Sequence, residues 1–396
     1  MKTSKRPILI VIGNNKNGGM AKRAAMLVNG FSDIGRKATI VVTKNNIEET
    51  FFDLKENVNV ITTDDVSAEL LTRDVVELKL LKVFCRLLPD DLWFRNDISY
   101  EVSKRRANLK LRNTFKQHNK PIIVALGLEN AVNSFYATKG MGADIVYATK
   151  TYAEGEICGY DKDKISGIIK KFSCVVCQTQ YTARFFQKMG IRNINVVGNP
   201  LYVETPCYEG ERNNSIVNFC RISREKRLDL LIKAFSVFHK EHPEYRVDIY
   251  GNIVSEGEQI YKEELLALIE ELGLSASVTI HDAKKNIHEI IKNAAMFVST
   301  STFEGLSNSM IEAMALGMPC ICTDCDGGGA REYIENGVNG LLISKDDETA
   351  LVEALNKFTD KDFARKCGRK AAEIRNTLDI NKILSEWEKV FDKYCS

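Results

Sequence analysis

The sequence predicts an α/β protein with two doubly wound domains, each built on a parallel sheet. Three observations lead to this prediction. At 396 residues the chain is too long for one typical domain and suits two. Short apolar runs of strand length alternate with helical patterns along most of the chain. The alternation pauses in a polar segment at 199–214 and then starts again, so this segment is the expected linker.

The first half supplies the pattern expected of the N-terminal domain, residues 1–198. Apolar runs predict strands at 8–12, 38–43, 58–61, 121–126, 145–148, 172–177 and 194–197, and a helical pattern occupies 20–33. The first run has only five apolar residues, which is too short for a signal peptide or a transmembrane helix. We therefore expect a cytoplasmic protein.

The second half repeats the pattern in a domain expected at 215–379. Strands are predicted at 216–220, 246–250, 277–281 and 294–300, and helices at 228–240 and 262–272. The last segment, 380–396, is predicted to be an amphipathic helix with one apolar face.

Charge is distributed unevenly along the chain. Residues 1–198 carry 31 Lys and Arg against 20 Asp and Glu, whereas residues 199–396 carry 24 against 33. The region 77–120 is the most basic, with seven cations and no acid between 103 and 120. Such helices beside aromatic residues can lie on an anionic membrane surface. They can equally be core-packed helices with solvated basic faces. No recognisable nucleic-acid module accompanies the charge.

The eleven cysteines lie mostly in strand-like segments, and no histidine stands near them at zinc-finger spacing. We expect them to be small buried thiols in a reducing compartment. The D-C-D at 324–326 invites a metal interpretation, but it falls at a strand end inside a glycine-rich block. No metal and no cofactor are expected.

The most informative stretch is 303–317, F-E-G-L-S-N-S-M-I-E-A-M-A-L-G, which follows an apolar strand. Ser307 or Asn308 would cap a helix, so a strand leads through a tight turn into a helix whose free amides favour an anion, usually phosphate. Glu304 and Glu312 bracket the turn, and carboxylates accept hydrogen bonds from paired hydroxyls. Hydroxyls, a diphosphate and further hydroxyls make up a nucleotide sugar. A surface Glu and a helix-capping Glu are the alternative.

This E-x7-E motif, with the G-M-P after it and D-G-G-G-A-R-E-Y-I-E-N-G-V-N-G-L-L-I at 326–343, resembles the signature of the retaining glycosyltransferases of family 4, which have the GT-B fold. The resemblance is strong over 215–345 and weak over 1–130. It implies two Rossmann-like domains that face each other across a cleft, and a C-terminal helix that crosses back to the first domain. It also implies a nucleotide diphosphate sugar, most simply a UDP-sugar, as co-substrate.

The resemblance assigns roles to individual residues. Glu312 would bind the donor ribose and Glu304 the donor hexose, while Arg221 and Lys226 would grip the diphosphate. The amides of a loop would stabilise the departing charge, namely Gly305, Leu306, Ser307 and Asn308. The G-G turn at Gly18 and Gly19 would contact the acceptor or the β-phosphate, although a plain glycine-rich turn is the alternative.

Three further candidates have weaker support. Asn252 and Asp282 stand at carboxyl ends of predicted strands, which line the ligand crevice of an open sheet, so they would flank the base. Where the family often has a histidine near the reacting sugar, this chain has G-L-E-N-A-V-N, and Glu129 is the acceptor-side candidate. A helix cap is its alternative role.

Together these features predict a glycosyltransferase that moves a hexose or N-acetylhexosamine to a glycan acceptor in cell-surface polysaccharide synthesis, such as capsule or O-antigen. The acceptor would be linked to a polyprenyl diphosphate, with the protein held at the inner face of the membrane. Two other functions fit the same fold. One is a UDP-sugar 2-epimerase, which forms a free epimer without an acceptor, and the other is a non-catalytic subunit that binds a glycan or a partner enzyme.

Overall fold

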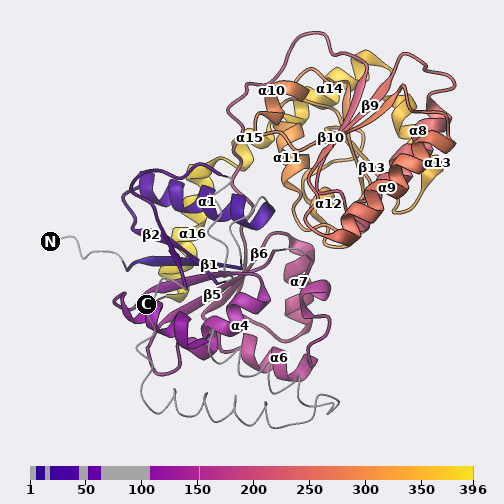
Figure 1. Cartoon of the computed structure of the whole chain (residues 1–396). Helices are drawn as coiled ribbons and strands as arrows, with labels where there is room; N and C mark the ends of the chain where they lie inside the picture. Colours follow the sequence, from indigo (N-terminus) through magenta and orange to yellow (C-terminus); the bar gives the residue numbers. More distant parts are fainter. Residues whose placement is uncertain (1–5, 14–17, 44–51, 64–107, 151, 396) are drawn as a thin grey trace, which may run out of the picture.

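A computed structural model describes residues 6–13, 18–43, 52–63, 108–150 and 152–395. Within them the chain forms two α/β domains joined by a linker and by a returning C-terminal helix (Figure 1). The first sheet has seven strands and the second has six, and all strand pairs are parallel. The predicted α/β class is therefore confirmed.

The N-terminal sheet has the order β3-β2-β1-β4-β5-β6-β7. Its strands are β1 (Ile8–Ile12), β2 (Ala38–Val42), β3 (Asn59–Thr62), β4 (Ile122–Leu126), β5 (Asp144–Ala148), β6 (Cys174–Cys177) and β7 (Ile194–Val196). The helices on it include α1 (Gly19–Asp33), α4 (Leu128–Ala137), α5 (Ala153–Ile157), α6 (Lys162–Ile169) and α7 (Gln180–Lys188). All five residues of β1 are fully buried, as expected for a central parallel strand covered on both faces.

The C-terminal sheet repeats this arrangement in the order β10-β9-β8-β11-β12-β13. Its strands are β8 (Ser215–Phe219), β9 (Arg246–Gly251), β10 (Val278–Asp282), β11 (Met296–Ser299), β12 (Cys320–Thr323) and β13 (Leu341–Ile343). The helices are α8 (Leu228–Phe238), α9 (Glu256–Glu271), α10 (Ile287–Ile291), α11 (Asn308–Ala315), α12 (Gly329–Tyr333), α13 (Glu348–Lys357), α14 (Lys361–Ala371) and α15 (Ile374–Thr377), with a short 3-10 turn at Arg224–Lys226.

Helix α9, which follows β9, begins earlier than the sequence predicts. The sequence predicts the helix from residue 262, whereas α9 begins at Glu256. The hydroxyl of Ser255 accepts a hydrogen bond from the amide of Glu258, which caps the helix one and a half turns earlier. The first four residues of α9, E-G-E-Q at 256–259, are polar or glycine and gave no apolar signal for this extension.

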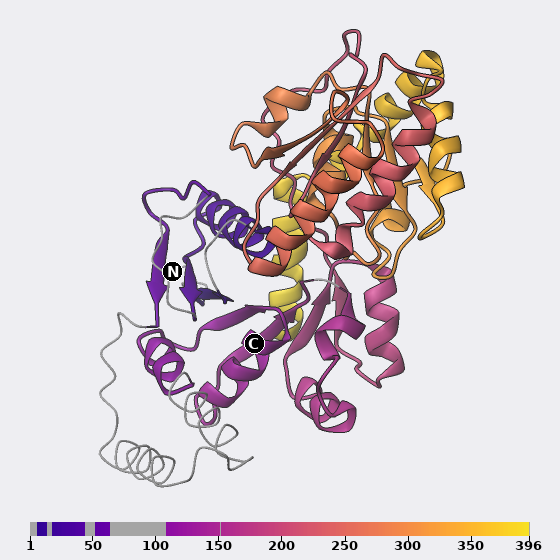
Figure 2. The ribbon, with the colours of Figure 1, turned by 45° about the vertical axis from the view of Figure 1, so that its right-hand side comes forward.

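The last helix, α16 (Ile380–Tyr394), lies against α1 of the N-terminal domain (Figure 2). Phe391 packs on Phe31 with ring centroids 5.9 Å apart, and Arg36 donates to Glu388 at 2.7 Å. Gly30 leaves room for the side chain of Leu384. The predicted crossing of the C-terminal helix is therefore confirmed.

The basic region at 77–120 lies partly within the described residues. A helix at 108–116 packs Leu111 and Phe115 into the N-terminal core, where both are essentially inaccessible, and Arg112 donates to the carbonyl of Ala137 at 2.8 Å. This part is a core-packed helix with a basic outer face. The remainder, 77–107, lies outside the described residues.

Candidate functional site

The positions of the predicted site residues follow from the strand order that the two sheets share. In each sheet the first six strands have the order 3-2-1-4-5-6, with a seventh strand added at the edge of the N-terminal sheet, and the strand order reverses between the first and fourth strands. Open α/β sheets bind ligands beyond the carboxyl ends of the strands at this switch point. Here those strands are β1 and β4 in one domain and β8 and β11 in the other. The loops after β1, β8 and β11 carry most of the predicted residues.

The centre of the C-terminal site is a contact between Lys226 and Glu304. The ammonium of Lys226 donates to Oε2 of Glu304, although 78 positions separate them. The two loops are joined by backbone, since the amide of Thr302 donates to the carbonyl of Glu225 at 2.9 Å. Burial is the largest single influence and would lower the pKa of Lys226, but the charge and hydrogen bond of Glu304, together with the charges of Cys220 and Glu225, raise the pKa above its ordinary value. Lys226 is therefore a permanent cation beside a carboxylate.

Arg221 lies on the same rim with its guanidinium held by carboxylates. It pairs with Glu225 at 2.5 Å and with Glu258 at 3.4 Å, and about half of its side chain is exposed. Burial would raise the pKa of Glu225, but hydrogen bonds and the charges of Arg221 and Lys226 bring it below its ordinary value. The charges of both Arg221 and Lys226 act on the carboxyl of Glu225, so the structure places these two predicted cations close together.

The loop from Gly305 to Asn308 leads into α11, and Ser307 is its N-cap, accepting from the amide of Met310 at 3.3 Å. The amide of Leu306 is not free for a ligand, because it donates to Oε1 of Gln178 in the other domain at 3.3 Å. In the described part of the chain, the amide of Asn308 has no protein acceptor. The positive end of α11 therefore opens toward the N-terminal domain.

Glu312 lies one turn into α11 and is almost inaccessible, with 6% of its side chain exposed. Its Oε1 accepts from Lys22 at 2.6 Å and its Oε2 lies 2.8 Å from Nε2 of His288. Burial would raise the pKa of this carboxyl, but the charge of Lys22 and the hydrogen bond and charge of His288 lower it below 4.5. Glu312 thus has one side-chain partner from each domain, and these contacts favour its ionised form.

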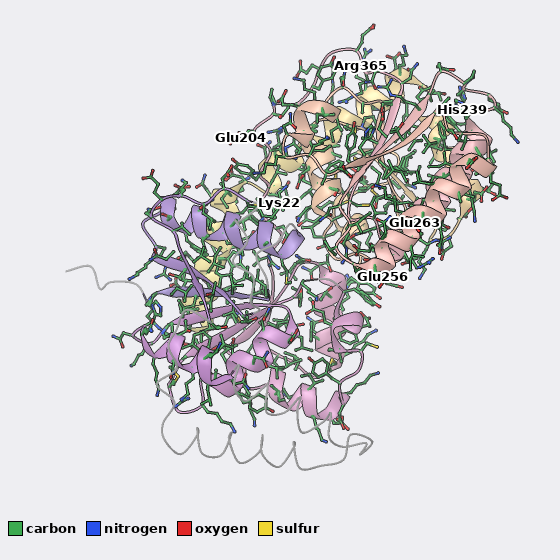
Figure 3. All side chains as sticks on the ribbon, viewed as in Figure 1. Lys22, Glu204, His239, Glu256, Glu263 and Arg365 are labelled. Atoms are coloured by element: carbon green, nitrogen blue, oxygen red, sulfur yellow. The ribbon has the colours of Figure 1, made fainter. Side chains whose placement is uncertain are left out.

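Gly18 and Gly19 begin α1 at the switch point of the first sheet. A Cβ on Gly19 would lie 3.4 Å from Nδ2 of Asn308, so the first turns of α1 and α11 meet across the domain boundary. Asn308 also accepts from Asn199 of the linker at 3.0 Å. Figure 3 shows Lys22 at the end of α1 that faces the second domain.

The remaining predicted residues lie further out. Asn252 follows β9, and its carbonyl accepts from the amide of Ile222 at 3.1 Å. Asp282 ends the edge strand β10 and is 89% exposed, 3.9 Å from Lys262. The structure therefore does not bring Asp282 next to Glu304. Glu129 is exposed in the first turn of α4, a position that stabilises a helix electrostatically.

Sequence reasoning missed Lys22, His288, Gln178 and Asn199. Lys22 looked like one of several basic residues on an amphipathic helix, and its partner lies 290 positions away. Gln178 joins the domains because its Oε1 accepts a hydrogen bond from the amide of Leu306. Its Nε2 also donates a hydrogen bond to Oδ1 of Asn199 at 2.9 Å. The one available signal was the position of Gln178 and Asn199 shortly after β6 and β7, at the same sheet edge as the glycine turn of Gly18 and Gly19.

The D-C-D at 324–326 and the cysteines of β6 carry groups that can bind a metal or undergo redox chemistry. Asp324 and Asp326 of the D-C-D pair with Arg331 at 2.5 Å and with Lys345 at 3.1 Å. Cys174 and Cys177 lie within β6, and burial raises the pKa of both thiols well above 9. Each group is accounted for by these local contacts.

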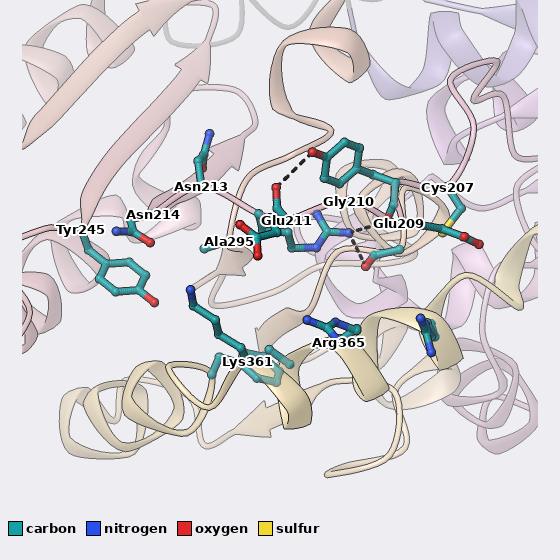
Figure 4. A pocket seen from close by; sticks show the side chains of 16 residues that line it. Cys207, Glu209, Gly210, Glu211, Asn213, Asn214, Tyr245, Ala295, Lys361 and Arg365 are labelled. Atoms are coloured by element: carbon teal, nitrogen blue, oxygen red, sulfur yellow. Dashed lines mark hydrogen bonds between the residues drawn. The ribbon is translucent and has the colours of Figure 1, made fainter.

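A pocket lies elsewhere on the C-terminal domain (Figure 4). It is lined by the linker end at 207–214 and by Lys361, Arg365 and Arg369 of α14. Asn214 and Ala295 directly precede β8 and β11, so the pocket is at the amino ends of the strands. It is therefore at the opposite edge of the sheet from Lys226 and Glu304.

Part of the chain is similar in sequence to known proteins. Residues 209–374 match a family model described as glycosyl transferases group 1. A relative from Campylobacter jejuni, N-acetylgalactosamine-N,N'-diacetylbacillosaminyl-diphospho-undecaprenol 4-alpha-N-acetylgalactosaminyltransferase, is 31% identical over 164 residues, which are 41% of this chain and 42% of the relative. The poly(ribitol-phosphate) alpha-N-acetylglucosaminyltransferase of Staphylococcus aureus is 25% identical over 232 residues, or 58% of this chain and 44% of the relative. The chain thus spans less than half the length of these relatives.

Solved structures match over nearly the whole chain. Anabaena HepE in complex with UDP-glucose has a TM-score of 0.77 at 19% identity and covers 98% of this chain and 99% of its own. TarM of S. aureus, solved with UDP among its ligands, has a TM-score of 0.75 at 15% identity with the same coverage. The chain has the GT-B fold of these neighbours, as predicted. Among the described residues, no helix is both long enough and apolar enough to cross a bilayer.

Proposed function

We propose that this protein is a retaining glycosyltransferase of family 4 that transfers a hexose or N-acetylhexosamine from a UDP-sugar to a glycan acceptor. The single observation that carries the proposal is the contact between Lys226 and Glu304 at the switch point of the second sheet. The family match at 209–374 includes both residues. The named relatives are themselves glycosyltransferases, and the structures of several neighbours contain UDP or UDP-glucose.

The proposed chemistry needs a group that accepts negative charge from a departing nucleoside diphosphate. Lys226 is held as a cation, and the first turn of α11 adds the positive end of a helix dipole. Arg221 lies on the same rim and supplies a second positive charge. Glu304 would accept hydrogen bonds from hydroxyls of the donor sugar, and it would also fix the position of the Lys226 ammonium. In this scheme the acceptor hydroxyl attacks the anomeric carbon from the face that the diphosphate leaves, the bond from that carbon to the diphosphate breaks, and the hydroxyl proton passes to the departing phosphate oxygen. Stabilisation of the leaving group would then supply most of the rate.

The N-terminal domain would bind the acceptor. The proposed acceptor is a glycan linked to a polyprenyl diphosphate, which the name of the C. jejuni relative supports by describing a diphospho-undecaprenol substrate. Attachment to an anionic membrane surface through 77–120 is part of the same proposal. Its test is flotation with liposomes of phosphatidylglycerol and phosphatidylcholine, and a protein that stays at the bottom of the gradient contradicts it.

The test of the function is a UDP-release assay with a panel of UDP-sugars, with and without lipid-linked glycans. The proposal predicts UDP release that depends on the acceptor. It also predicts that Glu304→Gln lowers kcat/KM about 10- to 100-fold, since a charged hydrogen bond contributes about 1.5–3 kcal/mol. Glu271→Gln, at the exposed end of α9, is the matched control and should keep full activity.

The same assay separates the competing functions. A UDP-sugar 2-epimerase would form a free epimer without any acceptor, which product analysis detects. A non-catalytic subunit would show no turnover with any donor. Either result contradicts the proposed transfer reaction.

A further inference from the structure

The buried carboxylate of Glu312 is a predicted donor-binding group whose two oxygens both already have a side-chain partner. Lys22 of α1 binds one oxygen at 2.6 Å and His288 of α10 binds the other at 2.8 Å. His288 belongs to the same domain as Glu312, so their contact moves with that domain. Lys22 reaches Glu312 from the other domain, so this ion pair exists only while the two domains stay together.

The two helices meet in a defined way. Gly19 faces Asn308 and, one turn further along each helix, Lys22 faces Glu312. These pairs place the first turns of α1 and α11, and hence the positive ends of both helices, next to each other. Two adjacent positive helix ends repel each other unless a negative charge lies between or beside them. The Lys22–Glu312 ion pair therefore opposes this repulsion in the absence of an anion.

Access to Glu312 follows from the same contacts. A carboxylate can accept about four hydrogen bonds, so two directions are left after Lys22 and His288. However, only 6% of the Glu312 side chain is exposed, and Lys22 approaches it from the side of the N-terminal domain. A ligand that enters between the domains reaches this carboxylate only after Lys22 moves.

We propose that Lys22 holds the place of the donor ribose in the donor-free protein and leaves Glu312 when the ribose hydroxyls bind. The inference rests on the proposed function, which assigns the ribose to Glu312. Lys22 is a positioning residue in this scheme, because it keeps the carboxylate ionised and the domains together until the donor arrives. The two hydroxyls then replace one ammonium as hydrogen-bond donors to the same carboxylate.

The test compares the wild type with Lys22→Met by hydrogen–deuterium exchange and by calorimetric titration with UDP. Without UDP, the first turns of α1 and α11 should exchange faster in Lys22→Met than in the wild type. With saturating UDP this difference should disappear, because Lys22 no longer contacts Glu312. Lys22→Met should bind UDP no more weakly than the wild type and up to about tenfold more tightly, since no ion pair has to be broken.

Three variants serve as comparisons. Lys22→Arg keeps a cation and should behave as the wild type, and Lys188→Met removes an exposed lysine at the end of α7 without effect. Glu312→Gln should match Lys22→Met in exchange without UDP but bind UDP at least about tenfold more weakly.

Two outcomes overturn the inference. One is an exchange difference that persists with UDP or is absent without it. The other is a tenfold weaker binding of UDP to Lys22→Met, which would make Lys22 a direct ligand of the nucleotide. Failure of the wild type to bind UDP would instead overturn the donor site itself, while the exchange difference without UDP would still report on the ion pair.

Discussion

Gly329→Ala tests whether the glycine block supports the loop proposed to bind the donor. Gly329 begins α12, and a Cβ there would lie 1.7 Å from the carbonyl oxygen of Gly305 and 3.0 Å from Cα of Leu306. Real Cβ atoms stay at least 3.0 Å from such atoms, so the two backbones must separate by more than an ångström. Neither neighbour is a flexible side chain that could turn away.

The size of the effect follows from two opposing contributions. In a helix, alanine is favoured over glycine by about 0.5–1 kcal/mol, which would stabilise the variant. Overpacking typically costs about 1–3 kcal/mol, and a clash with backbone belongs at the upper end. We expect a net loss of about 1–2 kcal/mol, which lowers the melting temperature by about 2–8 °C for a domain of this size. A loop displaced by an ångström should also weaken UDP binding about 10- to 100-fold.

The assay is thermal unfolding by circular dichroism together with calorimetric titration with UDP. Gly257→Ala is the matched control, because Gly257 lies within α9 and a Cβ there meets nothing within 4 Å. It should raise the melting temperature slightly and leave UDP binding unchanged. If Gly329→Ala behaves like this control, the described packing between α12 and the donor loop is wrong.

Three further predictions concern charge and packing. Lys226→Met should lower kcat/KM for UDP-sugar transfer by at least about tenfold, because the leaving diphosphate loses a cation, and unchanged kinetics would contradict its role. The pKa of Glu312 is lowered in the folded protein, so its ionised form stabilises the fold above pH 4.5 and this contribution is lost as the pH falls further. Melting curves of Glu312→Gln and the wild type should therefore differ most near pH 7 and approach each other as the pH falls below 4.5, and a constant difference would count against this. Phe391→Ala should cost about 3–5 kcal/mol in urea unfolding by leaving a cavity against Phe31, and a loss under 1 kcal/mol would show that α16 does not clamp the N-terminal domain.

The sequence predicted the local elements well because their signals are short in range. The five apolar residues at 8–12 form β1 as expected, and Ser307, one of two expected caps, is the N-cap of α11. The closeness of Lys226 and Glu304 was also foreseeable. Both follow strands that the α/β alternation places in one parallel sheet, so their loops meet at the same edge.

What the sequence could not give is the contact between the domains. Lys22 and Glu312 meet because two independently folded sheets face each other at a particular angle, and no local pattern encodes that angle. Leu306 illustrates the same limit. Its amide was expected to serve a phosphate, whereas it donates to Gln178 of the other domain. The expected role of Asp282 depended on strand order, and the structure places it on the edge strand β10, beyond β9.

The most direct measurement is a crystal structure of the protein with UDP. The account predicts the diphosphate at the first turn of α11, beside Lys226, and the ribose on Glu312 with Lys22 displaced. UDP bound instead in the pocket between 207–214 and α14, or bound with Glu312 still paired to Lys22, would contradict it.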